Sequence, residues 1–251
     1  MKKLIILLFS ALFMISCEID NYDSPDATIQ GTVYDQNGQP FQVGQGSGII
    51  RMREISWAKD SADYVGNQTL KVMQDGTYRN TKWFSGTYRM LPYAGAFYPY
   101  DDELQDGNDA GDLVKISNTT TKDFTVTPYL TIEWVDKPTV TSDNRIMCTV
   151  RFKRNQKLGY EMPDVREAWL LVSNTVNTNA RLLDYYPKAL SLTNDMEEMV
   201  LSFVSEPVKY VGVDYWIRVS MNCQTAVGKP ETNYPGMGSN NYSTIEKVHV
   251  P

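Results

Sequence analysis

Short stretches in which apolar and polar residues alternate recur along most of the chain, separated by segments rich in Gly, Asn, Asp and Pro. A period of two is typical of strands with one face turned to a core. The clearest stretches are 28–34, 69–73, 86–91, 123–129, 145–153, 213–222 and 242–250. This spacing predicts an all-β protein made of sandwiches or barrels.

Helix signals are few. The run Asp195-Met-Glu-Glu-Met is long enough for a turn or two, and Pro163-Asp-Val-Arg-Glu-Ala begins like a helix but runs into Trp169-Leu-Leu-Val. Neither run is long enough to form a helical layer.

Two turn signals lie in the first half of the chain. In GTVYDQNGQP, from Gly31 to Pro40, a strand end is followed by Asn-Gly, which accommodates the positive φ of a hairpin-type turn. Further on, Gly-Thr-Tyr-Arg occurs at Gly76 and again at Gly86. This repeat predicts a strand, a turn and the next strand.

The first residues have the composition of a targeting signal. Lys2 and Lys3 precede an apolar run from Leu4 to Phe13 that is too short to span a membrane. Met14-Ile15-Ser16-Cys17 resembles the bacterial lipobox, in which the cysteine is acylated and becomes the new N-terminus. We therefore expect residues 1–16 to be removed and residues 17–27 to form a lipidated, flexible tether; an ordinary signal peptide is the alternative.

Acidic residues follow Cys17 at once. The stretch 18–23 resembles the signal that exports some Bacteroidota lipoproteins to the outer face of the outer membrane, although a solvated tether would have the same composition. Loss of Lys2 and Lys3 would change the net charge from −6 to −8. Such a charge argues against nucleic acid as a partner.

The turn motifs carry a resemblance to a known class of domain. The opening G-x-V-x-D-x-x-G-x-P and the later D-G-x-Y and G-T-Y-x-M resemble the transthyretin-like, carboxypeptidase-regulatory β-sandwich. With the lipobox and Thr127-Pro128-Tyr129-Leu130, the chain resembles a family of uncharacterised Bacteroidota lipoproteins. Members have this N-terminal sandwich plus a second β-domain and tend to be encoded beside Sus-type glycan uptake systems.

The resemblance implies two β-sandwich domains with a boundary near Pro128. Residues 28–127 would form a transthyretin (prealbumin)-like sandwich. Residues 128–251 would form an immunoglobulin-like or fibronectin-III-like sandwich, because Asp214 to Asn222 and the final NYSTIEKVHV resemble its last two strands.

Catalytic signatures are weak. The single histidine, His249, lies in an alternating Val-His-Val stretch, and no zinc-binding spacing occurs. A pair of carboxylates of the glycosidase type remains open, because 30 acidic residues offer many pairs. Cys148 and Cys223 lie in strand-like stretches, where they could form a disulfide or remain buried free thiols.

The segment YDDELQDGNDAGD, from 100 to 112, is an oxygen-rich loop that could hold a structural Ca²⁺, or it is simply a solvated acidic loop. No other cofactor is expected. The candidate calcium ligands are Asp101, Asp102, Asp106, Asn108, Asp109 and Asp112.

Aromatic residues are concentrated just before this loop, in MLPYAGAFYPY. Pro and Gly exclude a regular central strand there, so these rings would lie on a loop or an edge, where aromatic faces can stack on sugars. Filling the sandwich core or the seam between domains is the alternative. A second loop, NYPGMGSNNY from Asn233 to Tyr242, has a similar character. The candidate glycan-binding residues are Trp83, Tyr93, Phe97, Tyr98 and Tyr100.

Three functions agree with this pattern. The favoured one is a non-catalytic, lipid-anchored protein at the exterior of the outer membrane that binds a polysaccharide or oligosaccharide for a Sus-type uptake complex. A structural component that docks an outer-membrane transporter is the second. A glycoside hydrolase or esterase is the third.

Overall fold

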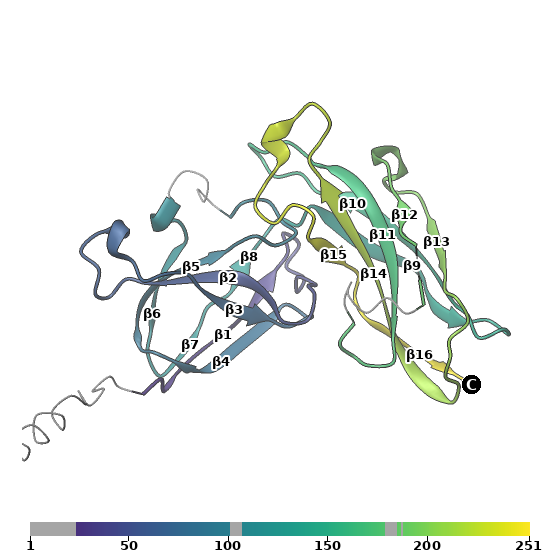
Figure 1. Cartoon of the computed structure of the whole chain (residues 1–251), viewed down its shortest axis with the longest axis horizontal. Coiled ribbons are helices and arrows are strands. Elements are labelled where there is room, and N and C mark those ends of the chain that lie inside the picture. Colours follow the sequence, from purple (N-terminus) through teal and green to yellow (C-terminus); the bar gives the residue numbers. More distant parts are fainter. Residues whose placement is uncertain (1–23, 101–106, 179–184, 187) are drawn as a thin grey trace, which may run out of the picture.

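The computed structural model describes residues 24–100, 107–178, 185, 186 and 188–251. The predicted all-β class is confirmed: strands form two sandwich-like domains that lie side by side, with short 3-10 helices in the connections (Figure 1). Within the described part of the chain, no helix has the length and apolar character needed to cross a membrane.

The first domain contains two sheets. One has the order β4-β1-β7, with β8 also pairing with β1, and the other has the order β3-β2-β5-β6. The strands are β1 (Ala27–Tyr34), β2 (Ser47–Glu54), β3 (Gln68–Val72), β4 (Thr77–Trp83), β5 (Gly86–Pro92), β6 (Asp112–Ile116), β7 (Thr119–Thr121) and β8 (Phe124–Thr125); the 3-10 helices are η1 (Ser61–Asp63) and η2 (Gly107–Asp109).

The turn signals of this domain are found where the sequence predicts them. Asp35 Oδ1 accepts hydrogen bonds from the backbone N–H groups of Asn37 and Gln39, at 2.8 and 2.9 Å, and Gly38 has a φ of 75°. The two Gly-Thr-Tyr-Arg segments begin near the starts of β4 and β5, which are consecutive strands. They belong to different sheets, so the chain crosses the sandwich between them instead of forming a hairpin.

The second domain also contains two sheets, one with the order β13-β10-β9 and the other with the order β12-β11-β14-β15, in which β16 also pairs with β14. The strands are β9 (Leu130–Val140), β10 (Ile146–Arg154), β11 (Asp164–Ser173), β12 (Leu190–Ser191), β13 (Leu201–Val204), β14 (Val213–Gln224), β15 (Asn240–Tyr242) and β16 (Glu246–Val250); the 3-10 helices are η3 (Asn194–Met196) and η4 (Pro230–Thr232).

The segment that begins like a helix at Pro163 is strand β11. Val165, Ala168 and Leu170 are buried in the core of the second domain, and β11 pairs along its length with the central strand β14. A register shift between Val165 and Glu167 explains why the apolar spacing departs from a strict period of two. Packing in the sheet therefore overrides a weak helical tendency.

Each domain has its own hydrophobic core. The core of the first domain is formed by residues between Ala27 and Val126, and that of the second by residues between Tyr129 and Val250. Ala96 and Tyr98 are exceptions, because they precede the predicted boundary yet pack in the second core. The two domains are therefore joined by a shared packed segment.

Cys148 and Cys223 are buried free thiols in the second core. They are therefore not paired, and the alternative of a disulfide between them is excluded in this structure. Burial raises the pKa of each thiol to about 12, because a thiolate is poorly solvated there.

The seam between the domains is held by direct contacts. Asn241, which is buried, donates from Nδ2 to the carbonyl of Ala96 at 2.8 Å and accepts from the N–H of Leu130 at 3.1 Å. Gly236, with a φ of 80°, lies so close to Ala94 that a Cβ would be 2.3 Å from the carbonyl carbon of that residue. The first aromatic loop and the loop before β15 are thus packed backbone to backbone.

Candidate functional site

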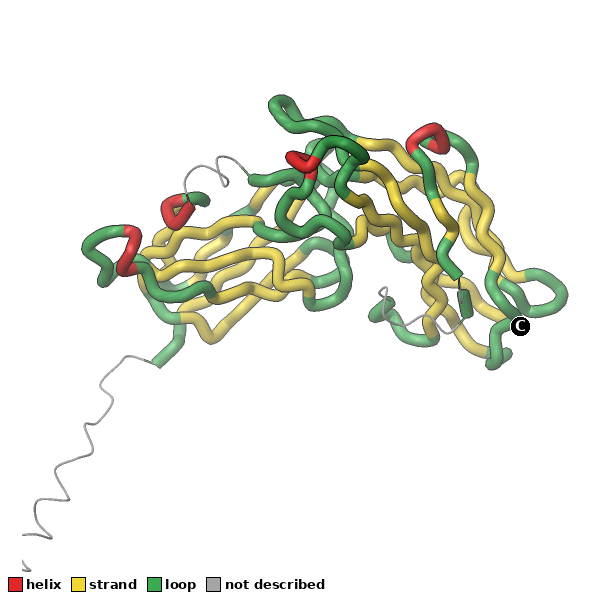
Figure 2. Tube along the Cα trace, turned by 45° about the horizontal axis from the view of Figure 1, so that its top comes forward, coloured by secondary structure: helices red, strands yellow, loops and turns green. Residues whose placement is uncertain are grey.

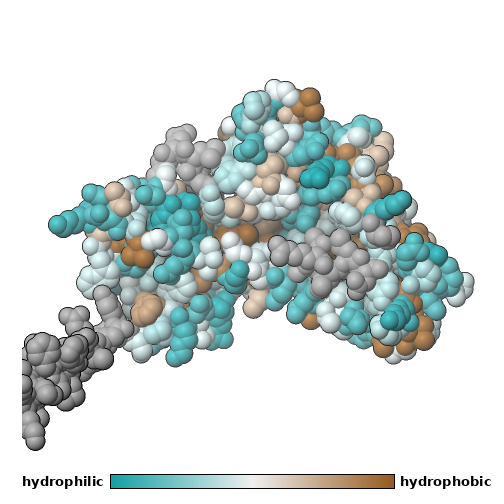
Figure 3. Space-filling view, in the orientation of Figure 1, coloured by the Kyte–Doolittle hydropathy of each residue, from teal (hydrophilic) through white to brown (hydrophobic). Residues whose placement is uncertain are grey.

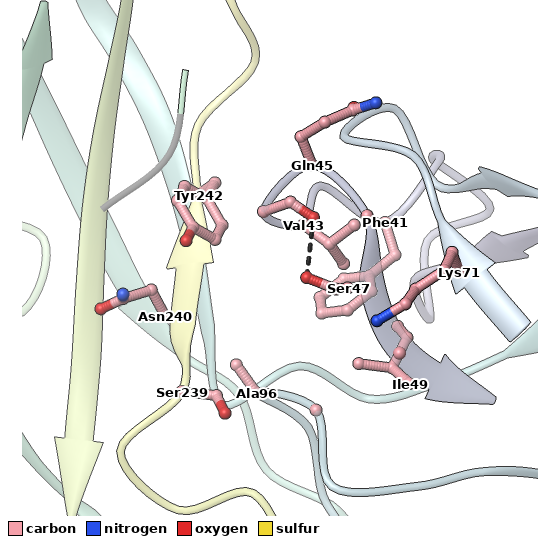
Figure 4. A pocket seen from close by; sticks show the side chains of 14 residues that line it. Phe41, Val43, Gln45, Ser47, Ile49, Lys71, Ala96, Ser239, Asn240 and Tyr242 are labelled. Atoms are coloured by element: carbon pink, nitrogen blue, oxygen red, sulfur yellow. Dashed lines mark hydrogen bonds between the residues drawn. The ribbon is translucent and has the colours of Figure 1, made fainter. Parts of the chain in front are cut away.

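A cleft of about 430 Å³ lies at the junction of the two domains. Loops connect and separate the strands of the two domains at this junction (Figure 2), and the loop before β2 lies opposite β15 (Figure 4). The surface is hollowed at the junction, with hydrophobic side chains inside the hollow (Figure 3). We call this feature the cleft; it is lined by Phe41, Val43, Gly44, Gln45, Gly46, Ser47, Gly48, Ile49, Lys71, Gly95, Ala96, Ser239, Asn240 and Tyr242.

The wall from the first domain is a glycine-rich loop. Gly46 has a φ of 72°, which L-residues with side chains rarely adopt, and it allows the turn in which the Ser47 N–H donates to the Gly44 carbonyl at 3.1 Å. The Ser47 hydroxyl donates to the same carbonyl at 2.7 Å (Figure 4). Because three of the five residues from 44 to 48 are glycines, much of this wall is backbone.

An apolar surface continues this wall. Phe41 and Ile49 are part of the first core and also line the cleft. The ring of Phe41 packs edge-on against Phe97, with centroids 5.7 Å apart. Phe97 therefore supports the cleft from behind and does not face into it.

The opposite wall is strand β15, which carries Asn240 and Tyr242 (Figure 4). The guanidinium carbon of Arg218, on β14, lies 4.3 Å from the centroid of the Tyr242 ring. Arg218 is completely buried and donates to the carbonyls of Val43, Thr178 and Ser243 at 2.8, 3.3 and 3.2 Å. These contacts fix Arg218, which in turn supports the tyrosine.

Burial also affects the ionisation of Arg218. Desolvation lowers the pKa of its guanidinium to about 10, while Tyr242 acts in the opposite direction. The group is still protonated at neutral pH. Among the described residues, no carboxylate forms an ion pair with it.

Unpartnered polar atoms gather beside this wall. In the β14–β15 pairing, Ser220 lies opposite Tyr242 and Asn222 lies opposite Asn240. Four buried atoms of this region have no hydrogen-bond partner in the described structure, namely Arg218 Nη2, Ser220 Oγ, Asn222 Oδ1 and Asn240 Oδ1. Buried polar groups are usually hydrogen-bonded. These four unsatisfied groups therefore do not stabilise the fold through hydrogen bonds of their own.

Lys71 supplies the charge of the cleft. It lies on β3, and its ammonium group is directed from the first domain toward the cleft (Figure 4). Of the described residues that line the cleft, none is Asp or Glu and Lys71 alone is charged.

A second hollow of about 390 Å³ meets the cleft at Phe41 and Tyr242. It runs between the turn after β1 and the start of β9, and its lining includes the carboxylates of Asp35 and Glu133. The two hollows therefore share an aromatic pair but differ in charge.

The structure does not bring the five predicted aromatic residues together. Phe97 is in the first core and Tyr98 in the second, each no more than 2% exposed, so both predictions of a solvent-facing sugar platform were wrong. Tyr98 is packed among three other tyrosines, Tyr129, Tyr160 and Tyr234. The alternative interpretation, that these rings fill the cores and the seam, holds for this pair.

The other three candidates are also engaged by the protein. Trp83 is 9% exposed and packs on Tyr88 near the start of β1, away from the cleft. The half-buried Tyr93 lies under the guanidinium of Arg51, whose central carbon is 4.4 Å from its ring centroid. Tyr100 is also half-buried, against Phe124, with centroids 5.8 Å apart.

Of the candidate calcium ligands, Asp101, Asp102 and Asp106 lie outside the described residues. Asn108 donates to the carbonyl of Ser61, Asp109 accepts from the Tyr64 hydroxyl at 2.7 Å, and Asp112 pairs with Lys122 at 2.5 Å. In the part of the chain that the structure describes, no three acidic, His or Cys side chains are grouped as metal ligands.

Sequence reasoning missed Phe41 and Lys71, which carry no local signal. Tyr242 belongs to the second aromatic loop, Asn233 to Tyr242, so its composition did point to a surface with binding character. The loop's other tyrosine, Tyr234, is 6% exposed and belongs to the tyrosine cluster.

Comparisons with known proteins match the first domain in one case and most of the chain in the others. Residues 27–127 match the model of the N-terminal domain of a protein family of unknown function, DUF3823. A crystal structure of a DUF3823 protein from Bacteroides uniformis is 25% identical, with a TM-score of 0.73, over 90% of this chain and all of the other. A DUF3823 protein from Parabacteroides merdae is 18% identical, with a TM-score of 0.63 and the same coverage.

Another similar structure, from Bacteroides uniformis, is of a protein described as a "putative carbohydrate binding protein". It is 19% identical, with a TM-score of 0.66, over 90% of this chain and all of the other. No curated protein matches the chain.

Proposed function

Since residues 27–127 match the N-terminal domain of DUF3823, a protein family of unknown function, and the chain is similar over most of its length to DUF3823 structures from Bacteroides, we propose that it is a non-catalytic glycan-binding protein. The sugar occupies the cleft between the two domains. A volume of about 430 Å³ lies within the ordinary range of small-ligand sites, roughly 300–1,000 Å³.

The observation that carries this proposal is the combination of groups in one cleft. Tyr242, which is half-buried, provides aromatic surface, on which the C–H face of a sugar ring can stack. Phe41 is only 4% exposed and supports the lining from the first core. Asn240 and Ser47 provide an amide and a hydroxyl group beside this ring, whereas the Gln45 amide is already hydrogen-bonded to Met73 Sδ and the Gln74 N–H. Sugar hydroxyls both donate and accept hydrogen bonds, so they match such a mixed lining.

The description of the similar protein from Bacteroides uniformis as carbohydrate-binding supports the same ligand class. Binding is also favoured over hydrolysis by the lining itself. Glycosidases need two carboxylates about 5–10 Å apart, and no described residue that lines the cleft is acidic.

In this proposal the protein is attached to the outer membrane through a lipid on Cys17, and it binds glycan for a Sus-type uptake system. Cys17 lies outside the described residues. Strand β1 begins at the end of the first domain that is far from the second domain (Figure 1). A tether at that end would leave the cleft accessible to polysaccharide outside the cell.

Titration of a broad glycan panel with the protein from residue 18 onward, which contains both cores, tests the binding proposal. We expect Tyr242→Ala to weaken binding at least tenfold and Tyr242→Phe to keep it. Trp57→Ala is the matched control, because Trp57 is 84% exposed on a loop of the first domain remote from the cleft. Folded protein that binds no member of the panel would refute the proposal.

The anchoring proposal has a separate test. Fractionation of cells should find the protein with the outer membrane, and Cys17→Ala should release it or leave it unprocessed. Equal membrane attachment of both forms would exclude a lipid on this cysteine.

A further inference from the structure

We infer that the glycan held in the cleft carries anionic substituents, either carboxylate or sulfate, and that Lys71 binds them. This inference rests on the proposed function, since it concerns the ligand of the same cleft. It follows from the charges around the cleft and from the position of Lys71.

The charge of the cleft is opposite in sign to that of the molecule as a whole. The chain has 30 acidic residues against 24 Lys and Arg, and its net charge is −6. Among the described lining residues of the cleft, however, no acid occurs and one lysine does. A positively charged hollow on an acidic protein selects an anion, because the remaining surface repels the same ligand.

The ammonium group of Lys71 is not neutralised by a described acidic side chain. Lysine side chains at the surface commonly pair with nearby acids; Lys122, for example, pairs with Asp112. In the described structure Lys71 has no ion pair with any acidic side chain. Its charge is therefore available to a ligand.

A glycine on the neighbouring strand leaves the ammonium group of Lys71 uncovered. Gly48 on β2 lies beside Lys71, and a Cβ on Gly48 would be 3.5 Å from the lysine Nζ. Since glycine has no side chain, nothing at this position covers the ammonium on the side of the cleft. A longer residue at position 48 would compete with a ligand for Lys71.

A second positive charge, that of Arg218, lies behind the opposite wall of the cleft. Arg218 lies against the ring of Tyr242 and is buried, and no carboxylate among the described residues forms an ion pair with it. A buried charge in a medium of low polarity acts over a longer distance than one in water. Lys71 and Arg218 therefore flank the aromatic wall from two sides, so that a sugar stacked on Tyr242 would have its acidic group toward Lys71.

The adjacent hollow provides an internal contrast. It contains Asp35 and Glu133, so an anionic group there would be repelled. Tyr242, which lines both hollows, can stack on any sugar ring. The charged groups on each side of it then decide the orientation of the chain of sugars.

The test compares polymers that differ only in charge. Polygalacturonate and its methyl ester form one pair, and dextran sulfate and dextran form the other, so the two arms distinguish carboxylate from sulfate. We expect at least one charged polymer to bind at least tenfold more tightly than its neutral partner, with an affinity that falls as NaCl is raised from 50 to 500 mM.

Variants then locate the effect. Lys71→Gln should weaken binding of the charged polymer about fivefold or more, and Lys71→Arg should retain it. Lys115→Gln is the matched control, because Lys115 is an exposed lysine on β6 of the same domain that does not line the cleft.

The outcomes separate the two proposals. If only neutral glycans bind, and Tyr242→Ala abolishes their binding, the inference about charge is wrong while the proposed function stands. If no glycan binds, both are wrong. If charged polymers bind equally to the wild type and Lys71→Gln, the role of Lys71 is refuted.

Discussion

The guanidinium of Arg218 in the second domain donates a hydrogen bond of 2.8 Å to the carbonyl of Val43 in the first domain. The same guanidinium lies on the ring of Tyr242, one wall of the cleft. Val43 belongs to the opposite wall. One buried side chain thus both links the two domains and supports the main aromatic surface.

Replacement of Arg218 should therefore affect stability and binding together. Arg218→Lys keeps a positive charge but loses the planar group that donates in several directions and stacks on Tyr242. We expect a loss of roughly 2–4 kcal/mol in the free energy of unfolding, because buried carbonyls lose their donors, and weaker glycan binding by the folded fraction. Denaturant unfolding and titration would measure the two effects. Unchanged stability would contradict the role assigned to Arg218.

Asn241 should be required for the packing of the domains. Asn241→Ala leaves the Ala96 carbonyl and the Leu130 N–H without their present partners, so we expect a loss of about 2–4 kcal/mol. Asn233→Ala, at an exposed position in the preceding loop, is the control and should change stability by less than about 0.5 kcal/mol. Chemical denaturation of both variants checks this, and equal losses would refute the prediction.

Tyr98 should behave as a core residue. Its hydroxyl donates to the Asn155 carbonyl at 2.7 Å, and burial raises the pKa of its phenol above the ordinary value. Tyr98→Phe should cost about 1 kcal/mol for the lost hydrogen bond, whereas Tyr98→Ala should cost about 3–5 kcal/mol for the cavity. Glycan affinity of the folded Tyr98→Phe protein should be unchanged. A large loss of affinity in that variant would restore Tyr98 as a binding residue.

The two buried cysteines should be unreactive in the folded protein. At pH 8, a thiol reagent should label neither Cys148 nor Cys223 until denaturant is added, because the pKa of each thiol is about 12 in the folded state. Rapid labelling of the native protein would show that the second core opens easily.

The raised pKa of these two thiols also predicts that the stability of the protein depends on pH. A thiol with a higher pKa in the folded state than in the unfolded state holds its proton more tightly when folded. Stability is therefore unaffected below the unfolded pKa, about 8.5, and falls as the pH rises from there toward 12. Unfolding titrations between pH 8 and 10 should show a smaller decline for Cys148→Ala than for the wild type. Parallel declines would contradict the assignment to this thiol.

The sequence by itself determined the class of the fold. The clearest alternating stretches located seven of the sixteen strands in the described structure, β1, β3, β5, β8, β10, β14 and β16, because a half-buried strand has to place every second side chain in a core. The Asn-Gly turn after β1 was also predictable, because it depends on local backbone geometry alone. Strand β11 was less clear, because its bulge disturbs the alternation.

The tertiary structure decided which aromatic residues face solvent. Phe97 and Tyr98 are adjacent in an extended segment at the seam, so their side chains point in opposite directions, one into each core. The sequence shows that these rings are apolar and close together, but not that a domain lies on both sides of them.

The candidate site is likewise a product of long-range packing. Phe41, Lys71 and Tyr242 lie far apart in the chain, and they meet because the loop before β2 and the strand β15 pack at the junction of the two domains. Local patterns report the preferences of neighbouring residues, whereas the cleft depends on contacts between separate domains. For that reason the sequence could predict two sandwiches and a binding character, while the residues of the cleft and its charge required the folded chain.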